Sequence, residues 1–330
     1  MQLDLRTIAI KPLRQTYGHI ARRLGADKPA SRYIEATMDL QPVENFHYRP
    51  TWEPQYDIFD PRHTKIVMKD WYALKDPRQF FYGGWTLARA RMQDAVEADF
   101  SLVEEMSLAA AYPDEGKKLV RDVILPLRHV AWGSNINNSY VGAYGYGIAI
   151  SQAATYASMD QLGIAQYITR IAMAFDDLEA LPVAKAAWLE EPAWQELRRY
   201  VEDLMVEKDW FEVLVAQNYV LEGLLYPLIY DRLNGKLNAL HGPVISMLTR
   251  FQGEWQVENA KWLDAVLKAA AADNRDNVAT LAGWIKTWRD RAVTALKPIA
   301  EKAFGEDATA ALDEVVQQLE RRAAKAGVAL

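Results

Sequence analysis

The sequence predicts an all-α protein. From residue 77 onward, apolar side chains recur at spacings of three and four, the pattern that lines one face of a helix. Alternating patterns typical of strands are almost absent, and several of the periodic segments exceed the usual helix length of about 11–12 residues. With 50% hydrophobic and 25% charged residues, the chain of 330 residues has enough apolar side chains for a large buried core.

Composition excludes several classes of function. The formal net charge of -6 argues against a nucleic-acid binder, which normally carries a basic patch. The chain has no cysteine, so disulfides, thiolate metal sites, iron–sulfur ligation and cysteine nucleophiles are excluded. It has neither an apolar signal segment nor a run of about 18 apolar residues, and we therefore expect a cytoplasmic protein.

The N-terminal part differs from the rest. Residues 1–40 predict a short helix followed by a loop, and residues 41–77 combine five prolines with many aromatic side chains. Proline at this density disfavours long helices and favours extended or turn backbone. We expect this aromatic segment to lie against the helical body or against another chain. The predicted domains are an N-terminal helix and arm, 1–76, and a helical domain, 77–330.

The first long helix is expected to begin at Asp76-Pro77-Arg78. Aspartate suits an N-cap and proline suits the first helical position. The periodic pattern then runs to about Ala111, where Tyr112-Pro113-Asp114 ends it.

Residues 115–159 predict a second long helical stretch, with Pro126 as a candidate kink. It contains a strip of small residues that would let a neighbouring helix approach closely, namely Gly142, Gly145, Ala149 and Ala153. A phosphate-binding loop at Gly145-Tyr146-Gly147 is disfavoured, because no dinucleotide or P-loop pattern surrounds it.

The remaining sequence predicts further helices from apolar periodicity alone. We expect them at 160–180, 183–205, 207–235, 236–251, 254–272 and 275–304. Pro298 is a candidate early end of the last of these. A final helix should follow Asp307 and stop near Gly327.

Long helices with inward polar groups are able to hold a dinuclear metal site, which needs Glu-x-x-His on each of two helices. Four of the five histidines have no glutamate three positions before them: His19, His63, His129 and His241. His47 does follow Glu44, but in the proline-rich segment and without a second copy. Glu222 is followed three residues later by Leu225. The sequence therefore predicts no metal ligands.

The second long stretch supports that prediction. From Val123 to Met159, 37 residues contain no aspartate or glutamate, and His129 is alone there. We interpret His129 as a hydrogen-bonded core or interface residue. Acidic residues on the first long helix are interpreted as a solvated face, with paired-carboxylate catalysis as a minor alternative; these are Asp94, Glu97, Glu104 and Glu105. We therefore predict no catalytic, metal or cofactor-binding residue in this chain.

Residues 44–85, ENFHYRPTWEPQYDIFDPRHTKIVMKDWYALKDPRQFFYGGW, closely resemble the β subunits of bacterial multicomponent diiron monooxygenases. Within that family the likeness is to the phenol hydroxylase and toluene monooxygenase type. Further matching runs extend it over most of the chain, at 14–33, 125–147, 184–212 and 215–233.

The resemblance implies a ferritin-like long-helix bundle without a metal centre, in an α2β2γ2 hydroxylase. The diiron centre and the substrate pocket would lie in the catalytic α subunit. A reductase with FAD and an iron–sulfur cluster would deliver electrons from NADH, and a small regulatory protein would also bind. The β subunit would act as a scaffold, burying on the order of several thousand Å2 against its partners.

Four aromatic residues are the interface candidates, because Trp and Tyr often dominate binding energetics: Trp52, Trp71, Tyr72 and Trp85. They are equally expected to pack inside their own subunit. Two other functions stay open: a self-sufficient ferritin-like metalloenzyme with unusual ligands, and a helical scaffold protein unrelated to oxygenation.

Overall fold

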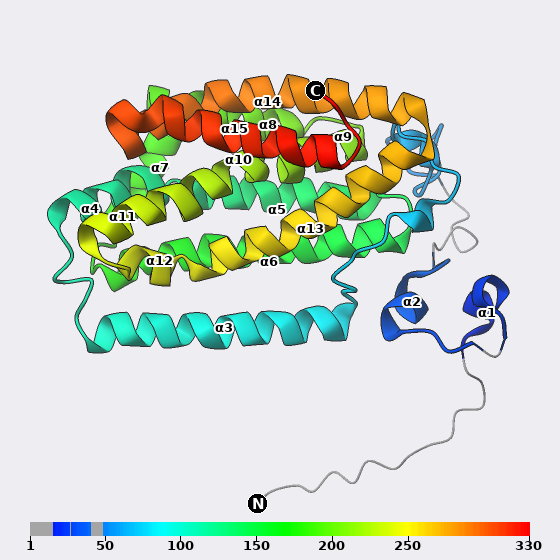
Figure 1. Ribbon diagram of the computed structural model, residues 1–330, viewed down its shortest axis with the longest axis horizontal. Helices are drawn as coiled ribbons and strands as arrows, with labels where there is room; N and C mark the ends of the chain where they lie inside the picture. Colours follow the sequence, from blue (N-terminus) through cyan, green and yellow to red (C-terminus); the bar gives the residue numbers. More distant parts are fainter. Residues whose placement is uncertain (1–15, 27, 41–48) are drawn as a thin grey trace, which may run out of the picture.

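The computed structural model describes residues 16–26, 28–40 and 49–330, and within them every regular element is helical (Figure 1). The all-α prediction is confirmed. None of the described helices is both long enough and apolar enough to cross a lipid bilayer. The long helices are α3 (Tyr82–Glu105), α5 (Leu127–Tyr144), α6 (Ile148–Ala174), α13 (Arg250–Asp273), α14 (Arg275–Phe304) and α15 (Ala308–Lys325).

A continuous helical rod from residue 210 to residue 241 passes through the middle of the molecule. It joins α9 (Trp210–Leu214), α10 (Glu222–Tyr226) and α11 (Asn234–His241) through two π-helical segments, Val215–Leu221 and Pro227–Leu233. Asp209 caps its start by accepting hydrogen bonds from the backbone N–H groups of Phe211 and Glu212. The rod is buried from Trp210 to Tyr230 apart from two half-buried positions, because other helices surround it.

The other helices pack around this rod. α5 and α6 form a helical hairpin behind it, and α13 runs obliquely across the front (Figure 1). α14 packs with α15 and with α8 (Pro192–Leu204) on the side of the bundle opposite α3. α3 lies along the edge next to α6, α13 and α12 (Val244–Leu248). The shorter helices α4 (Asp114–Leu119) and α7 (Ala180–Glu190) complete the bundle.

The described residues of the N-terminal part carry little helix, as expected. α1 (Gly18–Leu24) and α2 (Arg32–Thr37) are short, and beyond them the described arm has two single 3-10 turns at Pro61–His63 and Trp71–Ala73. Within residues 16–26 and 28–40, two short helices thus stand where a single one was predicted. Ile20, Met38, Tyr72 and Ala149 form a small apolar cluster that ties this part to α6.

The first long helix begins later and ends earlier than predicted. Asp76 does accept a hydrogen bond from the backbone N–H of Arg78, but this closes a local turn rather than a helix. Gln79 follows with φ of 55°, which breaks helical geometry, and α3 starts only at Tyr82. At the other end Ser107, with φ of 52°, prevents continuation beyond Glu105.

The stretch 115–159, predicted to be one long helical stretch with a candidate kink at Pro126, is divided into several helices. It contains α4, a π-helical turn at Val120–Ile124 and α5, and Gly147 with φ of 96° then reverses the chain into α6. α6 continues through the expected boundary at 159 as far as Ala174. The small residues serve the close approach within this hairpin: a Cβ on Gly142 would lie 2.8 Å from Thr155 Oγ1.

Later boundaries also shift. The predicted helix 183–205 is two helices, because Glu191 is extended and Pro192 starts α8. The predicted 236–251 segment breaks at Gly242, whose φ is 83°. α13 begins at Arg250, ahead of the predicted start. α14 matches the predicted 275–304 and runs through Pro298, and α15 lies where the last helix was expected.

Candidate functional site

The centre of the bundle holds a buried carboxyl group. Glu222 in α10 is fully buried, and its Oε1 accepts hydrogen bonds from side chains of three other segments. Ser134 Oγ donates from α5, Gln161 Nε2 donates from α6 at 3.1 Å, and Gln217 Nε2 donates from the π segment at 3.2 Å. Oε2 has no hydrogen-bond partner among the described residues.

Burial decides the protonation of this group. Removal from water raises the pKa of Glu222 to about 8, although the hydrogen bonds from Ser134 and Gln217 oppose the shift. The carboxyl group is therefore mostly protonated at neutral pH.

Neutral amides and hydroxyls extend the network around it. Gln217 Oε1 accepts from Asn137 Nδ2 at 2.9 Å, and Gln161 Oε1 accepts from the Tyr226 hydroxyl at 2.9 Å. Together with Glu222 and Ser134 they make the polar centre of the bundle. Because its members are neutral, the centre avoids the cost of a buried charge.

The π-helical segments flank Glu222 on both sides. In a π turn the repeating hydrogen bond joins residues five apart, so side chains five apart meet. Gln217 and Glu222 are such a pair and are hydrogen-bonded to each other. π turns are rare in proteins overall, but those that occur are often at functional sites. The centre around Glu222 is therefore a candidate functional site.

The polar centre does not fit a pair of irons. Such a pair needs carboxylates from four helices and two histidines, whereas this centre offers one carboxyl group, amides and a hydroxyl. The amide oxygens of Gln161 and Gln217 are already used as acceptors. Over the described ranges 16–26, 28–40 and 49–330, no three His, Cys, Asp or Glu residues cluster as metal ligands would.

The histidines lie elsewhere. His129 stacks on Trp188 with ring centroids 5.8 Å apart, and burial lowers its pKa to about 4, which keeps the imidazole neutral. His63 is buried at the arm, edge-on to Tyr144. The formal pair Glu44 and His47 lies outside the described residues.

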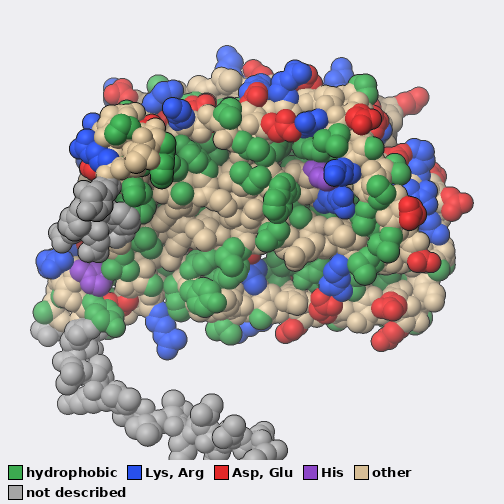
Figure 2. Space-filling view, turned by 180° about the vertical axis from the view of Figure 1, so that it is seen from behind, with side chains coloured by type: hydrophobic (Ala, Val, Ile, Leu, Met, Phe, Trp, Pro, Cys, Tyr) green, Lys and Arg blue, Asp and Glu red, His purple; other side chains and the backbone are tan. Residues whose placement is uncertain are grey.

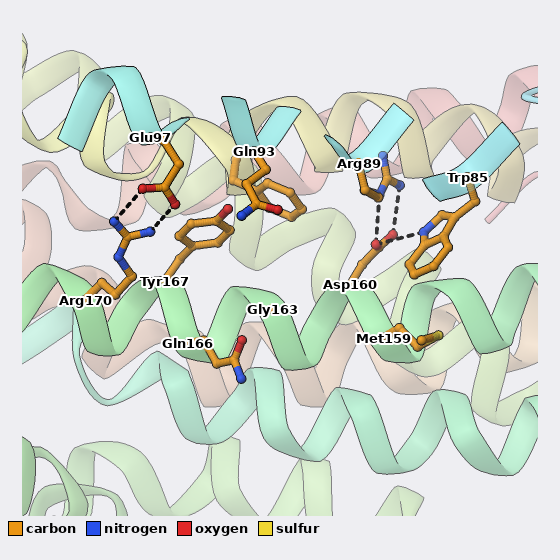
Figure 3. A pocket seen from close by; sticks show the side chains of 11 residues that line it. Trp85, Arg89, Gln93, Glu97, Met159, Asp160, Gly163, Gln166, Tyr167 and Arg170 are labelled. Carbon is orange, nitrogen blue, oxygen red and sulfur yellow. Dashed lines mark hydrogen bonds and ion pairs between the residues drawn. The ribbon is translucent and has the colours of Figure 1, made fainter. Parts of the chain in front are cut away.

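A cleft of about 280 Å3 lies between α3 and α6 (Figure 3). At one end Asp160 accepts hydrogen bonds from Arg89 Nε at 2.8 Å, Trp85 Nε1 at 3.0 Å and Trp255 Nε1 at 2.9 Å. At the other end of the labelled stretch Arg170 pairs with Glu97. The lining between them includes Gln93 of α3, Gly163, Gln166 and Tyr167 of α6, and Phe251 of α13.

The charged groups of this cleft are all paired. Arg89 binds both Asp160 and Glu258, and Glu97 receives two hydrogen bonds from Arg170. Arg170 holds the pKa of Glu97 below its ordinary value. Among the described residues that line the cleft, every charged side chain is thus paired, and the cleft is suited to binding an uncharged group. Of the acidic residues expected on a solvated face, Asp94, Glu104 and Glu105 are exposed, whereas Glu97 is half-buried in this pair.

The four aromatic interface candidates occupy different environments. Trp52 is 73% exposed, and its indole N–H donates to the Tyr144 hydroxyl at 3.1 Å. Trp71 is half-buried against Trp210, with ring centroids 5.8 Å apart. Tyr72 is buried in the small N-terminal cluster. Trp85 is buried and stacks on Tyr156 at 5.0 Å. Trp52 thus offers the largest free surface of the four.

Sequence reasoning singled out Glu222 but missed its partners. Ser134, Gln161 and Gln217 lie in the otherwise apolar faces of three segments, and Gln161 is 61 residues away from Glu222. Isolated amides within apolar runs such as VLVAQNYVLEGLLYPLIY are the signal that would have pointed to them.

The known proteins that this chain resembles are components of hydroxylases. Residues 52–274 match the model of the methane/phenol/alkene hydroxylase family. The chain is 44% identical to the phenol 2-monooxygenase oxygenase component DmpL of Pseudomonas sp. (strain CF600), covering 99% of this chain and 98% of that protein. It is 24% identical to the β subunit of the toluene-4-monooxygenase hydroxylase component of Ectopseudomonas mendocina, covering 74% and 75%.

A solved structure agrees. The crystal structure of phenol hydroxylase from Pseudomonas sp. OX1 contains a chain that superposes with a TM-score of 0.91 at 40% identity, covering 99% of both chains. The fold, the sequence identity and the share of each chain that is covered thus agree with one another. The chain belongs to the methane/phenol/alkene hydroxylase family of diiron monooxygenase hydroxylase components.

Proposed function

We propose that this chain is the non-catalytic β subunit of a phenol/toluene-type monooxygenase hydroxylase and serves as the scaffold of its catalytic α subunit. The observation that carries this proposal is the polar centre around Glu222. Its side chains converge from α5, α6 and the rod, where a dinuclear site would need four carboxylates. Neutral groups that are hydrogen-bonded to one another stabilise the fold but are poor metal ligands.

The partners follow from this role. The hydroxylase is an α2β2γ2 assembly whose diiron centre and substrate pocket lie in the α subunit. A reductase with FAD and an iron–sulfur cluster passes electrons from NADH, and a small regulatory protein binds the hydroxylase. Because NADH is a cytoplasmic electron donor, we place the complex in the cytoplasm. The aromatic ring to be hydroxylated, phenol or toluene, never meets this chain's polar centre.

Two similar proteins support the assignment. One is named an oxygenase component of phenol 2-monooxygenase, and the other is named subunit beta of a hydroxylase component. The proposed division of labour within the chain is an arm, residues 1–76, that reaches other subunits, and a helical body, residues 77–330, that provides the rigid support.

Iron analysis tests the non-catalytic role. The isolated chain is loaded anaerobically with Fe(II), desalted and assayed for bound iron. We expect far less than one iron per chain. About two irons per chain would overturn the proposal and favour a self-sufficient metalloenzyme.

Co-expression tests the scaffold role. The α and γ subunits are produced with and without this chain, and iron, assembly and phenol hydroxylation are measured. We expect iron to follow the α subunit and omission of this chain to abolish the assembly. Full-rate hydroxylation by α and γ alone would contradict the role.

A further inference from the structure

A second cleft, of about 260 Å3, lies where α13 and α15 pack on the helical rod. It is on the opposite side of the bundle from the hairpin of α5 and α6, whose side of the molecule is mostly green and tan in the view from behind (Figure 2). The second π-helical segment of the rod lines it with Pro227, Tyr230 and Asp231. No residue of this segment takes part in the polar centre around Glu222, although π turns are often found at functional sites.

Short side chains of α13 leave room in this cleft. Gly253, Val257 and Ala260 recur along it at spacings of four and three, so all three lie on one side of the helix. A Cβ on Gly253 would meet no atom nearer than the Tyr230 carbonyl oxygen, at 3.8 Å. The cleft is smaller than the roughly 300–1,000 Å3 typical of sites for drug-sized ligands. Its occupant is therefore a small molecule.

The rod gives the cleft an aromatic wall. Tyr226 and Tyr230 are buried and line it, and their rings meet edge-on with centroids 5.0 Å apart. The Tyr226 hydroxyl donates to Gln161 Oε1 in the polar centre, so this residue offers the cleft its ring rather than its hydroxyl. Aromatic rings pack favourably on one another in edge-to-face or offset geometry. The wall therefore favours an aromatic ring as its occupant.

One polar group of the cleft lacks a partner. Gln256 of α13 lines the cleft and is 8% exposed, and its Oε1 is buried without a hydrogen bond to any described residue. A buried acceptor that receives no hydrogen bond destabilises the fold. A ligand with a hydroxyl group would supply the missing donor.

The two charged side chains that line the cleft are engaged by other residues. Arg322 of α15 forms an ion pair with Asp264, with Nη2 and Oδ1 2.9 Å apart. Asp231 lies 3.9 Å from the Nε of Arg232, and its side chain is 77% exposed to water. The lining thus carries one charge of each sign, and neither is held free for a ligand of opposite charge. An uncharged molecule fits it best.

We propose that this cleft binds a small uncharged aromatic alcohol, with its ring against Tyr226 and Tyr230 and its hydroxyl donating to Gln256 Oε1. The ring matches the aromatic wall, the hydroxyl matches the unpartnered acceptor, and neutrality matches the engaged charges. This inference goes beyond the proposed function, because it gives the chain a ligand site of its own. Since the ligand binds the folded chain, its occupancy stabilises that state.

Two substitutions test the cleft. Gly253→Leu fills it, and Gln256→Met removes the acceptor while keeping a side chain of similar length. The matched controls are Gly283→Leu on α14, where a Cβ meets open space, and Gln317→Met, at an exposed position of α15 outside the cleft. Gln256→Met should keep or raise the thermal unfolding temperature, because it deletes a buried acceptor that has no partner.

Fluorine NMR measures binding of para-fluorophenol to the isolated full-length chain, so that no partner subunit contributes a site. We expect saturable binding with a Kd of about 1 mM or tighter. Fluorobenzene, which lacks the hydroxyl, should bind about fivefold more weakly, in line with the net value of one hydrogen bond. The charged para-fluorobenzoate and the ringless trifluoroethanol should not bind.

The variants locate the site. Gly253→Leu should abolish binding of para-fluorophenol, and Gln256→Met should lower its affinity to that of fluorobenzene. Both controls should bind as the wild type does. If Gly253→Leu does not fold, Gln256→Met decides the question alone.

Absence of saturable para-fluorophenol binding by the wild-type chain would overturn the proposal. Equal affinities for para-fluorophenol and fluorobenzene, or wild-type binding by Gln256→Met, would overturn it as well. A loss of stability in Gln256→Met would show that the amide already has a partner, which contradicts its role as the free acceptor. Iron analysis and co-expression are separate experiments, so the proposed function and this ligand site can fail independently.

Discussion

At the scale of single residues, Glu222 links the stability of the bundle to pH. Its carboxyl pKa is about 8 in the folded protein against an ordinary value of 4.5. Between these values the folded state holds a proton that the unfolded state has lost. The stabilisation is therefore complete below about pH 4.5 and is lost as pH rises toward 8.

Glu222→Gln should remove this dependence, because glutamine keeps the acceptor and cannot ionise. We expect the variant and the wild type to have similar free energies of unfolding at pH 5. At pH 8 we expect the variant to be more stable by up to about 5 kcal/mol, because one pKa unit is worth about 1.4 kcal/mol. Urea unfolding at several pH values measures it, with Glu104→Gln at an exposed site as control. A difference that does not vary with pH would refute the assignment.

Asp160 is a second buried acidic residue, and it forms an ion pair with Arg89. Asp160→Asn would leave the half-buried Arg89 without its main partner, and we expect a loss of about 3–5 kcal/mol in unfolding free energy. Glu202→Gln, which breaks an exposed pair with Arg198, should cost less than about 1 kcal/mol. Comparable losses in the two variants would show that burial does not strengthen the Asp160 pair.

At the scale of elements, the α5–α6 turn depends on one backbone conformation. Gly147 has φ of 96°, where a side chain is strained. We expect Gly147→Ala to cost about 1–2 kcal/mol. Gly163→Ala, at a half-buried helical position with open space for a Cβ, should instead stabilise by up to about 1 kcal/mol. Thermal unfolding of both variants checks the contrast, and equal signs would contradict it.

Elements with local signals were predictable and those without were not. α14 lies where its periodicity placed it, with Asn274 capping its start. Positive φ at Gln79 delays the start of α3, and positive φ at Ser107 ends it. Neither residue is a glycine, so neither break could be predicted from the residue type. Asp76-Pro77 carried the chemistry of a helix start, yet the same hydrogen bond closes a turn. The polar centre stayed hidden because its bonds join residues distant in sequence, such as Ser134 and Glu222.

At the scale of the whole molecule, the question is which aromatic residues hold this chain together and which hold it to others. Trp71 packs on the fully buried Trp210, so its removal should weaken the chain itself. Trp52 exposes 73% of its surface and contacts the helical body through a hydrogen bond to the Tyr144 hydroxyl. We predict that an exposed tryptophan of this kind adds little to the stability of its own chain and contributes to binding a partner, because tryptophan is enriched among the residues that dominate interfaces.

Trp52→Ala should therefore change the unfolding free energy of the isolated chain by less than about 1 kcal/mol and reduce recovery with the catalytic subunit. Trp71→Ala should cost the isolated chain about 3 kcal/mol, near the lower end for large core deletions, because the ring is half-buried. Urea unfolding and co-purification together separate the two roles. If Trp52→Ala destabilised the isolated chain as much as Trp71→Ala, the arm would be bound to its own bundle rather than presented to a neighbour.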